Sequence, residues 1–230
     1  MWNSLHSSPL PNLEEKAVII TGCDTGFGNK LARQLDEKGV TVFACCLYGE
    51  GKNALKLRNE CSNNLHIIQL DVTRDDEGFD PDTFRMKELL AVVNNAGIFL
   101  ACEATITSNE TYRRMLDVNT LGTVRVTKAF LPMLSESKGR IVVVESLAGI
   151  TAVPFMTAYS MSKHALAAYT ESLRREIFKF SVTLHTINPV AYDTRIADPD
   201  TISYNTYKEW NQASEDIKNL YGTEYLSKME

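Results

Sequence analysis

The sequence predicts an α/β protein with three layers, in which helices cover both faces of a doubly wound parallel sheet. Three observations predict this fold class. Short β-branched runs recur along the chain, helical patterns separate them, and the first run leads into a glycine-rich turn. Strands joined by right-handed helical crossovers pair in parallel, and such sheets bind ligands at the carboxyl ends of their strands. We therefore expect the functional residues at that edge.

Six runs have the continuous apolar character of strands buried on both faces. They are Ala17–Thr21, Val40–Cys46, Leu65–Leu70, Leu89–Val93, Ile141–Val144 and Val182–Ile187. Three segments between them have apolar residues at helical spacing. They are Lys30–Lys38, Glu110–Leu131 and Ser160–Phe180.

Two segments fit this alternation less well. Residues 74–88 contain Gly78, Pro81 and several carboxylates, so little helix is expected there. Residues 197–230 are polar and aromatic and contain no apolar run that would form a closing strand. We expect residues 1–16 to be an N-terminal arm and residues 17–230 to be a single domain that is short at its C-terminal end.

Composition excludes several classes of protein. The chain has 24 basic and 29 acidic residues and a net charge of −5, which gives no positive excess for nucleic acid. No apolar run approaches the roughly 20 residues that cross a bilayer, and no secretory signal is recognisable. The five cysteines lack zinc spacing and His partners, so we expect no metal site.

The segment Thr21–Gly28 reads T-G-C-D-T-G-F-G and lies between the first strand and the first helix. A glycine cluster alone is more often a simple turn, but this position favours dinucleotide binding. Glycines let the backbone approach a pyrophosphate, and a helix N-terminus attracts its charge. The expected coenzyme contacts in this loop are Gly22, Asp24, Thr25, Gly26, Phe27 and Gly28.

Tyr159 and Lys163 are four residues apart, so they share one face of the predicted helix. An ammonium group stabilises a neighbouring phenolate. Lowering a tyrosine pKa from about 10 to about 7 requires roughly 4 kcal/mol, which a desolvated lysine and a nicotinium charge together can supply. Tyr159 would then be the base in alcohol oxidation and the acid in the reverse reaction.

The glycine spacing G-x-x-x-G-x-G resembles that of the short-chain dehydrogenase/reductase family, whose members have a Rossmann fold. Further matching motifs are N-N-A-G at residues 94–97, Asn119 in D-V-N-T-L-G, and Ser146, which precedes Tyr159 by 13 residues. The resemblance implies a catalytic tetrad of Asn119, Ser146, Tyr159 and Lys163.

In that tetrad, Ser146 binds the substrate oxygen, Asn119 anchors a water of a proton relay, and Lys163 also holds the nicotinamide ribose. By the same resemblance, the domain of residues 17–230 is a dinucleotide-binding catalytic domain. The further coenzyme contacts that the resemblance implies are Asp71, Val72, Asn95, Ala96, Gly97, Pro189 and Thr194.

We expect NAD(H) to be preferred over NADP(H). The position at the end of the second strand, which contacts the adenosine ribose, is Cys46 and offers no cation to a 2′-phosphate. Asp24 in the glycine loop adds a negative charge that disfavours the extra phosphate.

The glycine loop and Leu31–Asp36 resemble the retinol and hydroxysteroid dehydrogenase branch, with hydroxybutyrate dehydrogenase a near neighbour. The resemblance implies a lipophilic alcohol or ketone as substrate, a homodimer as a possible assembly, and a location in the cytoplasm or peripherally at the endoplasmic reticulum. Glu145 departs from the pattern where a second serine is usual, and Val190 where glycine is usual. The alternatives are a coenzyme-binding protein without turnover of its own, which acts through a partner, and a hydroxybutyrate-type dehydrogenase.

Overall fold

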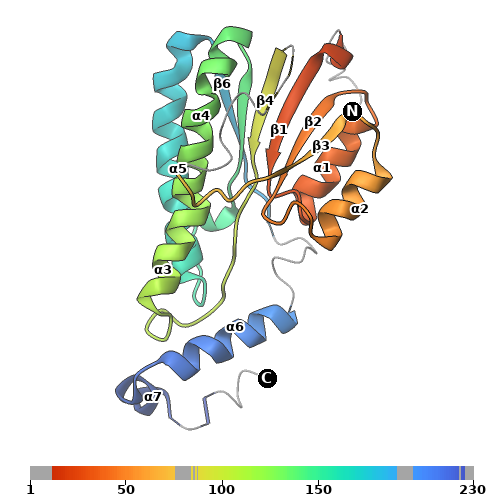
Figure 1. The fold of residues 1–230 in the computed structure, drawn as a ribbon. Helices are drawn as coiled ribbons and strands as arrows, with labels where there is room; N and C mark the ends of the chain where they lie inside the picture. The colour runs from red at the N-terminus through yellow and green to blue at the C-terminus, as the bar shows by residue number, and fades with distance from the viewer. Residues whose placement is uncertain are drawn as a thin grey trace, which may run out of the picture.

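The six predicted strands form one parallel sheet in the order β3-β2-β1-β4-β5-β6. The computed structural model describes residues 12–75, 84, 86, 88–190, 199–222 and 224–225 (Figure 1). The strands are β1 (Lys16–Thr21), β2 (Thr41–Cys46), β3 (Leu65–Gln69), β4 (Glu88–Asn94), β5 (Arg140–Val144) and β6 (Thr183–Ile187). The predicted α/β class and doubly wound sheet are confirmed, and no strand follows β6 within the described ranges.

Helices cover both faces of the sheet (Figure 1). The α-helices are α1 (Gly26–Asp36), α2 (Lys52–Glu60), α3 (Asn109–Leu116), α4 (Gly122–Ser137), α5 (Thr157–Ile177), α6 (Pro199–Gln212) and α7 (Glu215–Tyr221). Short 3-10 turns lie at η1 (Leu13–Glu15), η4 (Leu147–Gly149) and η5 (Phe178–Phe180).

The core lies in two layers because successive strand residues point to opposite faces. Ile19 packs with Phe130 and Leu166 from α4 and α5, whereas its neighbour Ile20 packs with Ala32 and Leu57 from α1 and α2. Both isoleucines are fully buried, which explains why the strands read as unbroken apolar runs rather than as alternating ones.

The segment predicted as one helix from Glu110 to Leu131 is divided. A π-helical turn, η3 (Asp117–Leu121), joins α3 to α4, and α4 then continues to Ser137. A π-turn inserts one residue into the helix and often marks a functional position. Asn119, one of the predicted catalytic residues, lies within it.

The polar and aromatic C-terminal segment forms α6 and α7, which lie beyond the carboxyl ends of the strands (Figure 1). Trp210 stacks on Tyr225 with ring centroids 5.0 Å apart, and both pack in a cluster with Tyr112 and Met115 of α3. This segment therefore covers the edge of the sheet at which a ligand is expected.

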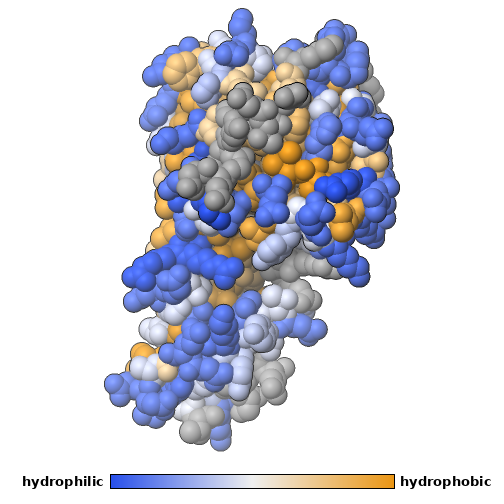
Figure 2. All heavy atoms as spheres, viewed as in Figure 1, coloured by the Kyte–Doolittle hydropathy of each residue, from blue (hydrophilic) through white to orange (hydrophobic). Residues whose placement is uncertain are grey.

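The surface in Figure 2 is mostly hydrophilic over the helices, and apolar atoms gather in the middle of this face, between α4 and the α1–α2 layer. None of the helices in the described ranges has the length and apolar character that crossing a membrane requires.

Candidate active site

A cavity of about 1020 Å³ lies at the carboxyl ends of the strands. Its walls come from the loop between β1 and α1, the segments after β2, β4 and β5, the start of α5, and one side of α6. Segments far apart in the sequence thus meet around one space, as the parallel topology predicts.

The glycine loop has a backbone that side chains would obstruct. Gly22 and Gly26 have φ values of +71° and +65°, in the left-handed region that favours glycine. A Cβ atom on Gly28 would lie 2.6 Å from the Gly22 carbonyl oxygen. Thr25, the N-cap residue of α1, makes no capping hydrogen bond with its side chain. The Thr25 side chain therefore does not cap the N-terminus of α1, and the glycine backbone of the loop fits a pyrophosphate.

Asn95 and Thr21 hold this loop against the end of β4. The Asn95 side-chain amide donates to the carbonyl oxygens of Thr21 (2.9 Å) and Gly22 (3.1 Å). The Thr21 hydroxyl accepts from the backbone amides of Asn95 and Ala96, both at 3.0 Å. The two coenzyme-binding segments predicted from the sequence are thus joined into one rigid unit.

Asp24 reaches from the glycine loop to the end of β2. Its carboxylate accepts hydrogen bonds from the backbone amides of Leu47 (3.0 Å) and Tyr48 (3.4 Å). Cys46, which was expected to contact the adenosine ribose, has a fully buried side chain in the α1–α2 core and does not line the cavity. Leu47, Tyr48 and the exposed Lys52 line this part of the cavity instead.

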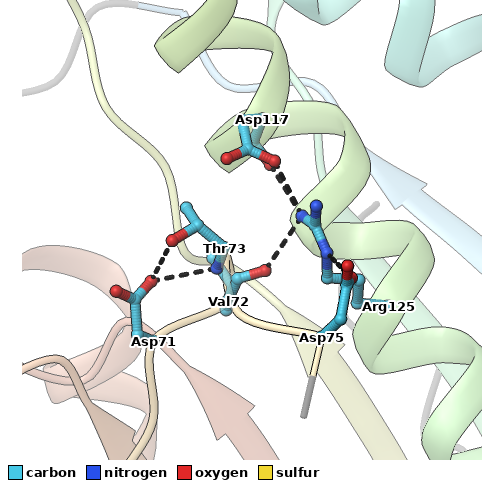
Figure 3. A network of polar contacts seen from close by, with 6 residues as sticks. All are labelled: Asp71, Val72, Thr73, Asp75, Asp117 and Arg125. Atoms are coloured by element: carbon cyan, nitrogen blue, oxygen red, sulfur yellow. Dashed lines mark hydrogen bonds and ion pairs between the residues drawn. The ribbon is translucent and has the colours of Figure 1, made fainter. Parts of the chain in front are cut away.

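A polar network fixes the loop after β3 against α4 (Figure 3). The Arg125 guanidinium contacts Asp75, the Asp117 carboxylate (2.9 Å) and the Val72 carbonyl oxygen (3.3 Å). The Asp71 carboxylate accepts from the amide (2.9 Å) and the hydroxyl (2.8 Å) of Thr73. In this network Asp71 shapes its own turn, and neither Asp71 nor Val72 lines the cavity.

Asn119 is buried at the π-turn, and its side chain connects the loop after β4 to α5 through hydrogen bonds. Its side-chain oxygen accepts from the Ile98 amide (2.8 Å), and its nitrogen donates to the Ile98 carbonyl (3.0 Å) and the Ser162 hydroxyl (2.9 Å). Ser162 donates in turn to the Tyr159 carbonyl (2.7 Å). Asn119 therefore joins the loop after β4 to the helix that carries Tyr159. Ser162 mediates this connection, and the motif Y-x-x-x-K did not reveal that role.

Tyr159 and Lys163 lie side by side on α5, with the Lys163 Nζ 5.8 Å from the centre of the Tyr159 ring. Burial raises the pKa of Tyr159, and its interaction with the Ser146 hydroxyl opposes that increase. Burial lowers the pKa of Lys163 to about 8, and the charge of Glu145 opposes that decrease. The lysine Nζ donates to the Val144 carbonyl at 3.0 Å.

The structure brings most of the predicted residues to this one cavity. Those that line it are Gly22, Asp24, Thr25, Gly26, Phe27, Asn95, Ala96, Gly97, Ser146, Tyr159, Lys163 and Pro189. Gly28 and Asn119 support the wall from behind, whereas Cys46, Asp71 and Val72 lie away from it. Thr194 lies outside the described residues.

Sequence reasoning did not identify the wall that faces Tyr159. Phe99 packs edge-on against the Tyr159 ring, and Met115 and Met156 extend the apolar lining. Two polar side chains of α6, Asn205 and Lys208, also line the cavity. No local motif marks these residues, because they come from the loop after β4, α3, the N-cap of α5 and α6, and meet only when these segments pack together.

Comparison with known proteins identifies the family. The family model of the short chain dehydrogenases matches residues 16–204. The chain belongs to this family. The resemblance inferred from the motifs is therefore confirmed.

Among curated relatives within this family, the chain is 39% identical to estradiol 17-beta-dehydrogenase 2 of Mus musculus, over 98% of this chain and 61% of that protein. It is 38% identical to retinol dehydrogenase 7 of Mus musculus, over 94% of this chain and 69% of that protein. The dehydrogenase/reductase SDR family member 9 of Bos taurus is 37% identical, over 99% and 72%. The chain thus spans about three fifths of the length of the first of these relatives.

Solved structures of short-chain dehydrogenases have the same fold. A short chain dehydrogenase from Burkholderia cenocepacia in complex with NADP has a TM-score of 0.71 and 27% identity, over 79% of this chain and 74% of that chain. A 3-oxoacyl-[acyl-carrier protein] reductase from Brucella melitensis with bound NAD has a TM-score of 0.71 and 28% identity, over 81% and 74%.

Proposed function

We propose that this chain is an oxidoreductase that transfers a hydride between NAD(H) and the CH–OH group of a lipophilic alcohol, either a retinol or a hydroxysteroid. The observation that carries this proposal is the position of Tyr159, Lys163 and Ser146 on the wall of the same cavity as the glycine loop. The phenol of Tyr159, the ammonium of Lys163 and the hydroxyl of Ser146 thus line the same cavity as the glycine loop that would bind a pyrophosphate.

The residues fit a nicotinamide dinucleotide. The glycine loop and the α1 N-terminus would hold the pyrophosphate, and Lys163 would hold the ribose next to the nicotinamide. Bound coenzyme would supply the acceptor or donor of the hydride. Asn95 and Asn119, which support the loops around the cavity, are already held in place by hydrogen bonds.

Tyr159 would exchange the proton with the substrate oxygen, and Ser146 would orient that oxygen. Because burial raises the pKa of Tyr159, its phenol is protonated at neutral pH and is ready to act as an acid in carbonyl reduction. Alcohol oxidation requires the phenolate, which needs positive charge nearby. Lys163 provides one such charge, and oxidised nicotinamide would provide another.

NAD(H) is the coenzyme we propose, because the carboxylate of Asp24 lies between the glycine loop and the end of β2, where a 2′-phosphate would add negative charge. The opposing feature is Lys52, an exposed cation on the same part of the wall. Solved relatives bind NAD in one case and NADP in another, so the family alone does not fix the coenzyme, and we propose that these two side chains influence the choice.

A lipophilic substrate is supported by the apolar side chains around Tyr159, which include Phe99, Leu100, Met115 and Met156. The names of the curated relatives, an estradiol dehydrogenase and a retinol dehydrogenase, point to the same class of alcohol. The homodimer stays a prediction, and so does the location in the cytoplasm or peripherally at the endoplasmic reticulum.

A turnover assay tests the proposal. Purified protein is incubated with NAD⁺ or NADP⁺ and with estradiol, all-trans-retinol or 3-hydroxybutyrate, and formation of reduced coenzyme is followed by absorbance. We expect turnover with a retinol or a steroid and none in the Tyr159→Phe variant. Turnover with 3-hydroxybutyrate alone would support the hydroxybutyrate alternative. Coenzyme binding without turnover on any alcohol would support the coenzyme-binding alternative.

A further inference from the structure

Glu145 is a carboxylate buried where β5, β6 and α5 meet, immediately before Ser146. Its side chain is only 6% exposed. Its backbone amide donates to the Ile187 carbonyl of β6 at 2.9 Å, and the Thr170 hydroxyl of α5 donates to its carboxylate. With the side-chain amide of Asn188 turned so that its nitrogen faces Glu145, that nitrogen lies 3.2 Å from the second carboxylate oxygen.

Thr170 and Asn188 are neutral, so they satisfy the oxygens of Glu145 without balancing its charge. A buried charge without a counter-charge costs several kcal/mol. Lys163 supplies the opposite charge: it is 5% exposed, and its Nζ is hydrogen-bonded to the carbonyl of Val144, the residue before Glu145. The Lys163 ammonium is thus anchored to the backbone one residue before Glu145, at the end of β5, and the charge of Glu145 acts on it through space.

In the part of the chain that the structure describes, the other groups around Lys163 are neutral at pH 7. On α5 its neighbour is Tyr159, whose raised pKa keeps it neutral at pH 7. The π-turn presents the neutral amide of Asn119, and the loop after β4 presents Gly97. Burial lowers the pKa of Lys163 to about 8, so the ammonium can lose its proton just above neutral pH. Glu145 is the group whose charge opposes this decrease.

We propose that Glu145 is a positioning residue whose buried carboxylate keeps the Lys163 ammonium charged and fixed at the end of β5. The inference rests on the proposed function, in which the ammonium holds the nicotinamide ribose and stabilises the Tyr159 phenolate. Glu145 itself transfers no proton and need not touch the substrate.

The sign of the effect follows from the charge. Replacing Glu145 by glutamine keeps the size of the side chain and removes its negative charge, so the Lys163 ammonium becomes less stable and loses its proton at a lower pH. Binding that depends on the ammonium should therefore weaken at a lower pH. An opposite charge at short range commonly shifts a pKa by roughly one unit or more, and we expect the midpoint to move down by about that amount.

The test is a fluorescence titration of NADH at a series of pH values, which needs no turnover. In the wild type, we expect NADH affinity to fall as the pH rises through about 8, where Lys163 loses its proton. In Glu145→Gln, the midpoint of that fall should lie about one unit lower. The alkaline limb of kcat/KM should move in the same direction.

Thr170→Val is the matched control, because it removes the hydroxyl that donates to Glu145 and leaves the charge. A purely structural role for Glu145 would make both variants lose affinity with an unchanged midpoint, and that result would overturn the inference. Glu145→Asp should restore the wild-type midpoint because it restores the charge. Should Glu145→Gln not fold, Glu145→Ser takes its place, and a wild-type midpoint in that variant counts against the inference equally.

Absence of NADH binding by the wild type at every pH would instead contradict the proposed function. The two failures are therefore distinguishable in one set of titrations.

Discussion

Tyr159 is held by contacts that do not involve its hydroxyl. Its ring packs edge-on against Phe99, with centroids 5.0 Å apart and ring planes at 82°, and its carbonyl accepts from Ser162. The ring and the backbone thus fix the position of the side chain independently of the hydroxyl, which interacts with Ser146. This separation makes the role of the hydroxyl testable by itself.

Tyr159→Phe should leave NADH affinity nearly unchanged and should lower kcat by a factor of at least about 100, because a positioned acid–base group contributes roughly that much or more. Fluorescence titration and steady-state rates measure the two effects. A wild-type kcat would show that another group exchanges the proton. A large loss of NADH affinity would show that the hydroxyl also binds the coenzyme.

Asp24→Asn should raise the affinity for NADP(H) relative to NAD(H), because the amide removes a negative charge and retains an oxygen that accepts from the Leu47 amide. A tenfold change in relative affinity corresponds to about 1.4 kcal/mol, and we expect a change of this order. Lys52→Ala should change the ratio in the opposite direction. Parallel titrations with NADH and NADPH measure it, and a constant ratio in both variants would remove these side chains from the selection.

Short motifs made most of the candidate site predictable from sequence, because each motif places its side chains through local geometry. Tyr159 and Lys163 share a helix face by spacing alone. Cys46 was assigned to the ribose for a similar reason, but both faces of β2 are covered by helices, so its thiol points into a core. A run of buried residues does not reveal which position is the first to emerge at the edge of the sheet, and here Leu47 does so.

At the scale of elements, Arg125 connects three of them. It lies on α4, and it contacts Asp75 and Val72 after β3 and Asp117 at the start of the π-turn (Figure 3). Its guanidinium is held between two carboxylates, which raise its pKa against the effect of burial. The loop and the π-turn that carries Asn119 thus share one support.

Arg125→Met should lower the free energy of unfolding by about 1–2 kcal/mol, between the values typical of exposed and of buried ion pairs. Urea denaturation measures it. Arg175→Met is the control, because Arg175 is exposed on α5 and, among the described residues, pairs with Glu171 one turn away, so a change within about 0.5 kcal/mol is expected. Equal losses in the two variants would show that the network in Figure 3 adds no stability beyond that of a surface pair.

The elements themselves were predictable to different extents. Each strand is a short apolar run, and these were found without exception. The division between α3 and α4 was not predictable, because a π-turn adds one residue without disturbing the apolar stripe on either side. Helix α2 was also missed, since only Ala54 and Leu57 of its nine residues are buried and no stripe results.

At the scale of the whole molecule, the C-terminal helices are attached to the sheet domain through Glu209. Its carboxylate accepts from the Ser108 amide and from the Thr111 hydroxyl, both at 2.6 Å, at the start of α3. The partners are about 100 positions apart in sequence, so no local pattern could predict this contact. The contact places α6 along the wall of the cavity.

Glu209→Ala should raise the KM for the alcohol and leave NADH affinity unchanged, because it removes two charge-assisted hydrogen bonds that join α6 to the start of α3 and do not involve the glycine loop. Hydrogen exchange should show faster exchange in α6 and little change in β1. Glu215→Ala is the control, since its side chain is exposed on α7 and forms an ion pair with Lys218 of the same helix. Unchanged exchange in α6 would mean that other contacts hold the segment, such as the aromatic cluster and the hydrogen bond from the Thr206 hydroxyl to the Ala101 carbonyl.

The hydrogen bonds from Asn95 and to Thr21 have a consequence for the rate and entropy of coenzyme exchange. Ordering a backbone residue costs about 1–2 kcal/mol, and this loop has already lost that freedom when the protein folds. Contact energy with a dinucleotide then appears as affinity instead of being consumed by ordering. Encounter should be limited by diffusion into the cavity, so variants of this loop should differ in how long the coenzyme stays bound.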